Sequence, residues 1–405
     1  MALTDLVGSY ARSFDDRVAE VLGPAAERVP ALRERLAGAG VASGELTDVA
    51  ALDRIPLLTK DELIDVQAAS RPFGGLLAPG VQLKRVFQSP GPLYEPELRE
   101  PDPWRWAPAF EAAGFGTNDI VLNAAGYHLT PLGAMLEEGV FALGGTVIPG
   151  GVGNLDLQVQ ACVDVAVTAY VGLPSYLKAL LDKADELGAP LSLERAFVLA
   201  EPLPPSLRAW LEERVAVVRQ GYGTAEAGNL GYECERKQGF HVPDDALVQV
   251  CDLTSGHALG AGEEGQVVAT LFRADYPLVR LGTGDLSAFL TEPCECGRPT
   301  PLLAGWLGRV GEAVKVRGMF LHPRQIRAVM AEVPGVARYR FVIERREHRD
   351  ELRCEIVSEE GADLVALADA VRDRVRSGLR FRVEVEPVES LEPDTPVLVD
   401  EREWT

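Results

Sequence analysis

The pattern of apolar and polar positions along the chain predicts an alternation of strands and helices. Short apolar runs that end in glycine, proline or polar turns predict strands within residues 119–125, 144–151, 165–174 and 193–204. Amphipathic stretches beside these runs predict helices within residues 129–144, 174–188 and 204–215. Roughly the first sixty residues also read as helices. Strands that alternate with helices are typical of an α/β sheet covered by helices.

The pattern changes after about Leu307, which predicts a second domain. Residues 337–360 read as a charged hairpin, residues 363–379 as a helix and residues 380–391 as a strand. A small α+β unit of this kind lies within the usual range of domain sizes. We therefore predict two domains, residues 1–307 and 308–405.

Composition narrows the class of protein. A chain of 405 residues with 47% hydrophobic residues can form globular domains around real cores. A formal net charge of −21 disfavours nucleic acid and anionic membranes as partners. Neither an apolar run of about 18 residues nor a signal-peptide pattern is visible, and six cysteines are too sparse for a disulfide scaffold. These features predict a cytoplasmic protein with free thiols.

Two short segments rich in glycine and threonine each present one acid. "QGYGTAEAG" (Gln220–Gly228) contains Glu226, and "VRLGTGDL" (Val279–Leu286) contains Asp285. We interpret both as turns, in which glycine lets the backbone approach a ligand closely. The acid beside such a turn can accept hydrogen bonds from vicinal hydroxyls or hold Mg²⁺ next to a phosphate, and both tasks arise in nucleotide binding. Taken alone, either segment fits an ordinary strand-to-helix turn with a solvated acid better.

Seven segments in the right order change that balance, because together they resemble the adenylate-forming enzymes and specifically the phenylacetate–coenzyme A ligase family. They are residues 54–65, 144–177, 199–213, 221–234, 276–286, 294–297 and 307–326. The resemblance implies a large multi-sheet α/β domain at the N-terminus and a small, mobile α+β lid domain at the C-terminus.

The resemblance also implies a role for individual residues. Tyr222 would stack on adenine. Gly221, Gly223, Thr224 and the turn Ala200–Glu201–Pro202 would line the nucleotide. Asp285 would accept hydrogen bonds from the ribose hydroxyls, and Arg309 would reach the ribose or the phosphate. Glu226 would hold Mg²⁺, and with Arg309 it would serve catalysis. Two alternatives remain open: Glu226 as a helix N-terminal acid and Arg309 as a surface ion pair. Glu312 lies where the family usually has a hinge aspartate.

Four further residues form a candidate metal site, namely Cys234, His241, Cys294 and Cys296. Three thiolates and one imidazole can complete a tetrahedral structural zinc site. Spacing alone leaves free thiols beside a surface histidine equally open. Members of the resembled family carry the same set, which favours zinc. Cys162, Cys251 and Cys354 lie in apolar segments and are interpreted as packing residues.

Two departures from the family concern the ATP phosphates. The family's phosphate loop is a Ser/Thr/Gly run followed by lysine, whereas this chain has Ser89 and Gly91 flanked by prolines, which lack N–H groups. No lysine follows, and Glu95, Glu97 and Glu100 would repel a triphosphate. The late lysine of the family is also missing: the last lysine is Lys315, and a guanidinium such as that of Arg402 is not an equivalent substitute.

The resemblance predicts a ligase that uses ATP and an aryl or otherwise apolar carboxylic acid to form an acyl-adenylate. Coenzyme A or another thiol then takes the acyl group. Three segments would wall the acyl pocket: Tyr127–His128, Gly144–Thr146 and Val171–Pro174. Two alternatives stay open, an enzyme that performs only the transfer step and a non-catalytic adenylate-binding protein. A homodimer is compatible with all three.

Overall fold

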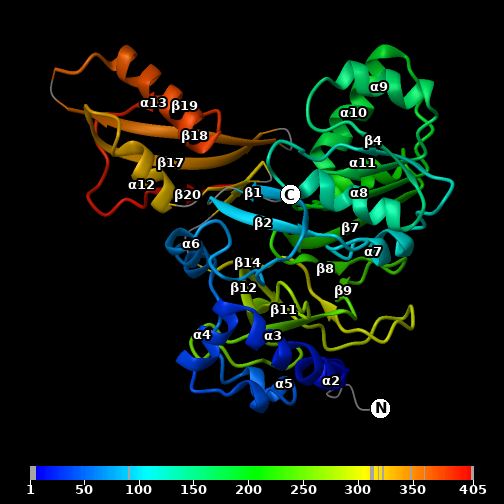
Figure 1. Cartoon of the computed structure of the whole chain (residues 1–405). Coiled ribbons are helices and arrows are strands. Elements are labelled where there is room, and N and C mark those ends of the chain that lie inside the picture. Colours follow the sequence, from blue (N-terminus) through cyan, green and yellow to red (C-terminus); the bar gives the residue numbers. More distant parts are fainter. Residues whose placement is uncertain are drawn as a thin grey trace. The chain divides into compact units, whose positions relative to one another are not determined.

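The computed structural model describes residues 6–89, 92–310, 314–317, 319–321, 323–346, 349–359 and 361–402. The chain divides into two compact units, one of residues 1–203 and 208–310, the other of residues 204–207 and 311–405 (Figure 1). Each unit contains helices, strands and a hydrophobic core. The predicted α/β fold class is confirmed.

An eight-stranded mixed sheet dominates the larger unit, in the order β13-β9-β8-β7-β6-β5-β3-β4. Its strands are β3 (Ile120–Asn123), β4 (Thr146–Pro149), β5 (Ala169–Gly172), β6 (Arg195–Val198), β7 (Val217–Thr224), β8 (Gly228–Tyr232), β9 (Phe240–His241) and β13 (Leu302–Leu303). The neighbours from β7 to β4 are parallel, and those from β7 to β13 are antiparallel. The four predicted strands are therefore confirmed as β3 to β6.

Helices connect the parallel strands of this sheet. They are α8 (Leu132–Ala142), α9 (Leu155–Asp164), α10 (Pro174–Leu187) and α11 (Pro205–Glu212), whereas α7 (Ala107–Ala112) precedes β3. Trp106 and Phe110 each pack edge to face against Phe197 within one core cluster, which joins the α7 segment to β6. Such parallel sheets bind ligands at the carboxyl ends of their strands.

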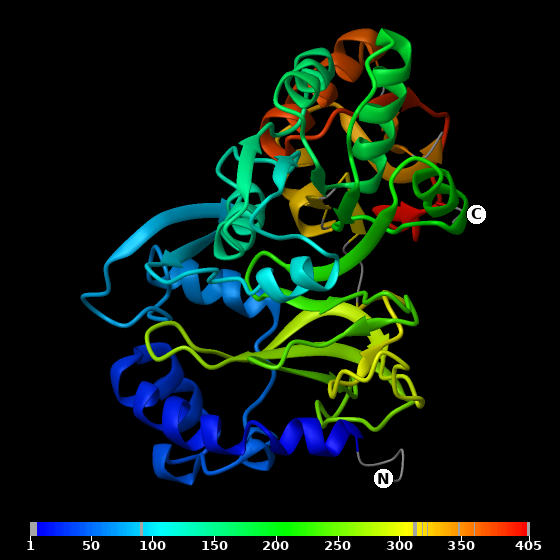
Figure 2. The same ribbon diagram turned by 90° about the vertical axis from the view of Figure 1, so that its right-hand side faces the viewer.

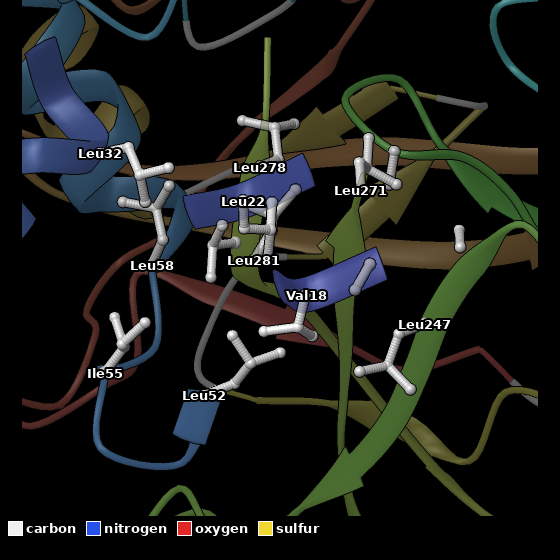
Figure 3. Packing of buried hydrophobic residues seen from close by; sticks show 14 of the residues in the cluster. Val18, Leu22, Leu32, Leu52, Ile55, Leu58, Leu247, Leu271, Leu278 and Leu281 are labelled. Atoms are coloured by element: carbon white, nitrogen blue, oxygen red, sulfur yellow. The ribbon is translucent and has the colours of Figure 1, made fainter. Parts of the chain in front are cut away.

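A four-stranded antiparallel sheet forms a second layer of the larger unit. Its order is β10 (Ala246–Cys251), β11 (Glu264–Leu271), β12 (Leu278–Ala288) and β14 (Gly308–Arg309). The N-terminal helices cover it, and Figure 3 shows Val18, Leu22 and Leu32 beside Leu278 and Leu281. These helices are α1 (Leu6–Arg12), α2 (Asp15–Arg17), η2 (Val18–Leu22), α3 (Gly23–Arg28), α4 (Pro30–Gly38), η3 (Ser43–Glu45) and α5 (Val49–Leu52). The helical start of the chain is confirmed.

Helix α6 and a two-stranded hairpin complete the larger unit (Figure 2). α6 (Lys60–Ala69) begins at the capping box of Thr59 and Glu62. The hairpin consists of β1 (Leu83–Ser89) and β2 (Leu93–Leu98). Gln67 on α6 exchanges two hydrogen bonds with the backbone of Tyr94 and so ties the helix to β2.

The interpretation of the two glycine-rich segments as turns is wrong. Tyr222 and Asp285 both lie inside strands, β7 and β12, because each segment has a paired neighbour: β8 for β7, and β11 and β14 for β12. Glu226 lies in the three-residue connection between β7 and β8, not at the start of a helix. The alternative role of Glu226 as a helix N-terminal acid is therefore also wrong.

The smaller unit contains a four-stranded sheet and two helices. The sheet has the order β19 (Glu384–Pro387), β18 (Arg349–Ser358), β17 (Val336–Arg346), β20 (Leu398–Asp400). α12 (Pro323–Met330) and α13 (Leu364–Leu379) share its core, and Asp363 caps α13. A short hairpin, β15 (Val314–Val316) and β16 (Met319–Leu321), precedes them. The predicted hairpin, helix and strand of this region are confirmed. None of the described helices is long and apolar enough to cross a lipid bilayer.

Candidate functional site

Asp285 is the centre of a polar cluster in the larger unit. The Tyr222 hydroxyl donates to its Oδ2 at 3.0 Å, and the Trp306 indole N–H donates to its Oδ1 at 3.1 Å. The Arg309 guanidinium forms an ion pair with Oδ1 at 3.0 Å. These groups come from β7, from the loop before β14 and from β14 itself, which pairs with β12 at Asp285. The structure thus brings Tyr222, Asp285 and Arg309 together, three residues that the sequence predicted for one site.

Burial controls the electrostatics of this cluster. Burial and the charge of Asp285 raise the pKa of Tyr222 well above its usual value, so the phenol stays a hydrogen-bond donor. Burial lowers the pKa of Arg309, although Asp285 and Glu226 oppose the shift. The two carboxylate oxygens of Asp285 therefore face several hydrogen-bond donors. If two vicinal hydroxyls of a ligand replaced the phenol or the indole, Asp285 would still accept hydrogen bonds.

The predicted nucleotide-lining glycines have a clear packing role. A Cβ on Gly221 would lie 2.5 Å from the Phe197 ring, and one on Gly223 would overlap the Gly228 carbonyl and approach Trp106 to 2.9 Å. Only glycine therefore fits at these two positions of β7. The Thr224 hydroxyl accepts a hydrogen bond from the Ala227 N–H and so stabilises the β7–β8 connection. Contact of these residues with a nucleotide stays a prediction.

The Ala200–Glu201–Pro202 turn follows β6 at the carboxyl end of the parallel strands. Ala200 has a left-handed backbone with φ of 69°. The Gln220 amide donates to the Glu201 carbonyl at 3.2 Å, which ties the turn to β7. The turn therefore lies at the edge of the sheet where ligands of such folds bind.

Glu226 lies in a second, acidic cluster with Lys60, Glu95 and Ser89. The Lys60 ammonium lies 3.0 Å from Glu226 Oε1, and the Ser89 hydroxyl donates to Glu95 Oε1. Burial opposes ionisation of Glu226, yet Lys60 and hydrogen bonds from Lys60 and Thr224 hold its pKa below the usual range. Burial and the charge of Glu226 raise the pKa of Glu95 to about 8. These acids therefore favour positive charge, and the Lys60 ammonium supplies one such charge at Glu226.

Sequence reasoning missed Lys60 and Trp306. Lys60 occupies the first position of α6, where the helix dipole favours acids, and this mismatch was the available signal. Trp306 is 40% exposed and lies three residues before Arg309, immediately before the resembled family's joint segment of residues 307–326. No sequence pattern indicated that its indole would reach Asp285.

The cations near the phosphate loop are engaged by buried acids. Lys84 forms ion pairs with Glu97, at 3.2 Å, and with Glu138. Arg85 pairs with Glu97 at 3.2 Å and with Glu137 at 2.8 Å. The loop residues Pro90 and Gly91 lie outside the described residues, as does Glu312.

The expected wall of the acyl pocket is wrong for one of its three segments. The register pairs Thr146 with Ile120, so Gly144–Thr146 lies at the amino end of β4. Tyr127–His128 and Val171–Pro174 instead come at or after the carboxyl ends of β3 and β5. A parallel sheet has these ends on opposite edges, so the three segments cannot wall one pocket.

The four predicted metal ligands converge. Their candidate ligand atoms, on Cys234, His241, Cys294 and Cys296, all lie within 4.8 Å of one another. The Sγ atoms of Cys234 and Cys294 are 3.5 Å apart, and Cys296 Sγ is 3.3 Å from His241 Nε2. This donor set fits a tetrahedral zinc ion.

Polar groups around the four residues also fit a metal. His241 Nδ1 lies 3.2 Å from the Thr300 hydroxyl, which leaves Nε2 for the metal. The backbone N–H groups of Arg236 and Arg298 donate to the Sγ atoms of Cys234 and Cys296. The other three cysteines, Cys162, Cys251 and Cys354, are buried, in agreement with their prediction as packing residues.

In the smaller unit, Arg402 is held by acids. Its guanidinium pairs with Asp350 at 3.0 Å and with Asp400 at 2.6 Å, and its side chain is 3% exposed. Arg345 pairs with the same Asp350 carboxylate at 3.1 Å. Arg402 therefore serves a buried ion-pair network, and a nucleotide phosphate would have to break it.

Comparisons with known proteins identify the family of this chain. The sequence-family model for AMP-binding enzymes matches residues 108–270, and the family model for their C-terminal domain matches residues 318–395. Phenylacetate-coenzyme A ligase of Thermus thermophilus is 32% identical over 349 residues, which cover 82% of this chain and 78% of that protein. This chain belongs to the phenylacetate–coenzyme A ligase family. The corresponding Escherichia coli enzyme is 27% identical over 91% of this chain and 86% of its own length.

Solved structures of the adenylate-forming enzymes have the same fold. The 2-hydroxyisobutyryl-CoA ligase in complex with its acyl-AMP and CoA matches with a TM-score of 0.88 and 25% identity, over 98% of this chain and 90% of that chain. The amide bond synthetase McbA of Marinactinospora thermotolerans matches with a TM-score of 0.55 and 24% identity, over 71% of this chain and 61% of that chain. The family assigned from the seven sequence segments is therefore confirmed, and the chain is an enzyme of the acyl-CoA synthetase type.

Proposed function

We propose that this protein is an AMP-binding, carboxylate-activating enzyme in which the acyl-transfer step is retained and activation by ATP is slow. In the complete reaction an apolar, preferably aromatic, carboxylate attacks the α-phosphate of ATP and displaces pyrophosphate. The thiol of coenzyme A then attacks the acyl carbon of the adenylate and displaces AMP. The family relatives named phenylacetate-coenzyme A ligase support the aromatic acid and the thiol acceptor.

The observation that carries the proposal is the cluster around Asp285. Its carboxylate is 5% exposed and faces the donors of Tyr222, Trp306 and Arg309. In the proposal Asp285 accepts the two ribose hydroxyls and Tyr222 presents its ring to adenine. Arg309, already at the carboxylate, reaches the ribose or the phosphate. The Ala200–Pro202 turn, Gly221, Gly223 and Thr224 line the same pocket.

Glu226 is proposed as the ligand of Mg²⁺. Its carboxylate is 8% exposed, and its Oε2 has no hydrogen-bond partner among the described residues, so it has an oxygen available for a hard cation. Bound Mg²⁺ would neutralise charge on the phosphate. Lys60, 3.0 Å from Glu226 Oε1, would hold the carboxylate in place.

Three features support slow activation by ATP. The phosphate loop is followed by the buried acid Glu95 in place of a lysine. Lys84 and Arg85 are bound by buried glutamates, and Arg402 by Asp350 and Asp400. An acyl-adenylate has one phosphate and needs none of these cations to hold a β- or γ-phosphate. The alternative, a non-catalytic adenylate-binding protein, has the same binding site without transfer.

The cysteine cluster is proposed as a structural zinc site. Three sulfur ligands and one histidine leave no open position for substrate. The ion would connect β8 and β9 with the segment before β13 and would not take part in the reaction. A homodimer stays a prediction.

The transfer step can be tested directly with a synthetic aryl acyl-adenylate such as phenylacetyl-AMP. The protein, this adenylate and coenzyme A should give the acyl thioester and AMP, detected by mass spectrometry, faster than the same mixture without protein. Asp285→Ala should slow the reaction at low adenylate concentration. Adenylate that binds but does not react would favour the non-catalytic alternative, and adenylate that does not bind would contradict the proposal.

A further inference from the structure

Trp306 contacts Asp285 but has no role in the proposed function. Its indole N–H lies 3.1 Å from Asp285 Oδ1, although Trp306 is 40% exposed and Asp285 only 5%. Trp306 lies outside the described strands, in the segment between β13 and β14. A half-exposed tryptophan therefore donates to the buried carboxylate at which the ribose is proposed to bind.

The acceptor sites of Asp285 are nearly filled. An ionised carboxylate offers about four lone-pair sites. Tyr222 donates to Oδ2, and the Trp306 indole and the Arg309 guanidinium both lie against Oδ1. Two vicinal hydroxyls that both donate to Asp285 need two sites, whereas about one is left. One of the three present donors therefore has to leave when a ribose binds.

Trp306 is the donor that can leave with the smallest rearrangement. The Tyr222 hydroxyl also lies 3.3 Å from the Thr283 hydroxyl, and its ring packs against the core of the larger unit. Arg309 lies on β14, whose backbone pairs with β12 at Asp285. Both of these donors are thus fixed by strands, whereas Trp306 belongs to a connecting segment.

The Trp306 side chain can turn away while its backbone stays in place. The Leu307 N–H donates to the Leu286 carbonyl at 3.0 Å, and the Ser287 hydroxyl donates to the Gly305 carbonyl at 2.7 Å. These bonds hold the segment against β12 on both sides of Trp306. Rotation of an exposed side chain between rotamers is fast and needs no change of the backbone.

We propose that Trp306 is a displaceable cap on Asp285. The inference rests on the proposed function, because the ligand that displaces the cap is the ribose diol of AMP or of an acyl-adenylate. In the nucleotide-free protein the indole N–H satisfies a buried carboxylate oxygen, which is costly to leave without a partner. A bound ribose takes over this position, and the indole returns when AMP leaves. The cap thus competes with the ribose and favours release of AMP.

The experiment compares AMP with 2′,3′-dideoxy-AMP, which lacks both hydroxyls, by isothermal titration calorimetry. Trp306→Phe keeps an aromatic ring and removes the N–H donor. It should bind AMP about three- to tenfold more tightly than wild type, the value of one hydrogen bond, because the ribose no longer has to displace a donor. Its affinity for the dideoxy nucleotide should equal that of wild type, because this ligand does not displace the indole.

Trp210→Phe is the matched control, because it makes the same substitution at a partly exposed tryptophan whose ring lies 3.7 Å from the Arg214 guanidinium. It should bind both nucleotides like wild type, and thermal unfolding should show that both variants are folded. In an Asp285→Ala background, Trp306→Phe should leave the affinity for AMP unchanged, since the group that the indole caps is absent.

The outcomes separate the cap from the proposed function. If wild type binds AMP and Asp285→Ala weakens this binding, equal or weaker binding by Trp306→Phe would overturn the cap alone. Tighter binding of both nucleotides by Trp306→Phe would also overturn it, because the indole would then only obstruct the pocket. AMP that binds neither wild type nor Trp306→Phe would contradict the proposed function and the cap together.

Discussion

Asp285 shows how one carboxylate can organise a site. It receives a phenol, an indole and a guanidinium from residues that lie up to 63 positions away in the sequence. Two hydrogen bonds and one ion pair therefore fix the position of the carboxylate. The same donors are available to reorganise around a sugar.

Replacement of this carboxylate should weaken AMP binding selectively. We expect Asp285→Ala to reduce the affinity for AMP by about 2–4 kcal/mol, the value of one or two charge-assisted hydrogen bonds, as measured by isothermal titration calorimetry. Glu264→Ala, at an exposed position on the neighbouring strand β11, is the control and should bind AMP like wild type. Equal AMP affinity in wild type and Asp285→Ala would mean that the carboxylate has only a structural role.

For the glycines of β7 we predict an effect on stability, because these residues allow close packing. A methyl group on Gly223 would overlap the Gly228 carbonyl, so Gly223→Ala should destabilise the protein by about 1–3 kcal/mol in thermal or chemical unfolding. Gly116→Ala, which has open space around the added methyl group, should leave stability almost unchanged. Unchanged stability of Gly223→Ala would show that the hairpin adjusts freely.

The local sequence pattern predicted many of the secondary-structure elements but not which strands pair. The spacing of apolar residues predicted strands β3 to β6 and helices α8, α10 and α13, because the residues that each element buries recur within a short stretch of the chain. The segments around Tyr222 and Asp285 were predicted as turns, because glycine and threonine indicate turns when no partner is visible. Their strand character comes from pairing with β8, β11 and β14, which the glycines and threonines of these segments do not indicate.

The candidate site shows the same limit. Cys234, His241, Cys294 and Cys296 could be grouped from residue type and resemblance, and the structure brings them together. The Lys60–Glu226 ion pair joins residues 166 positions apart, and the Trp306 indole reaches Asp285 through the return of the chain to β14. Neither contact has a signature in residue type alone.

The cysteine cluster joins short elements of the larger unit. β9 and β13 are two-residue strands, so a bound ion would contribute much of the local stability. We expect purified protein to carry about one zinc per chain, and Cys296→Ser to lose it and to unfold at a lower temperature. Elemental analysis checks both, with Cys162→Ala as a control that should keep its zinc. Zinc-free protein, purified without chelator, would contradict the assignment.

At the scale of the whole molecule, the chain has the fold of its family, and we propose that it lacks the positive charge that a triphosphate needs. The relatives cover most of both units, and the four-stranded sheet of the smaller unit is complete. Glu95 is itself part of the acidic cluster, and the cations Lys84, Arg85 and Arg402 are held by buried carboxylates.

The overall reaction should reflect this loss. With a panel of aryl acids, ATP–pyrophosphate exchange should be slower than in an ordinary family member by roughly 10²–10³, the cost of one missing transition-state donor. The E. coli phenylacetate-coenzyme A ligase provides the reference under the same conditions. Rapid exchange with any acid would show that other groups supply the charge.

The central claim is that the nucleotide site is intact and the triphosphate site is not. Calorimetric titration of the same protein with AMP and with ATP, both in the presence of Mg²⁺, tests it most directly. We expect AMP to bind more tightly than ATP by at least about tenfold, or roughly 1.4 kcal/mol. ATP that binds as tightly as AMP, or more tightly, would contradict it.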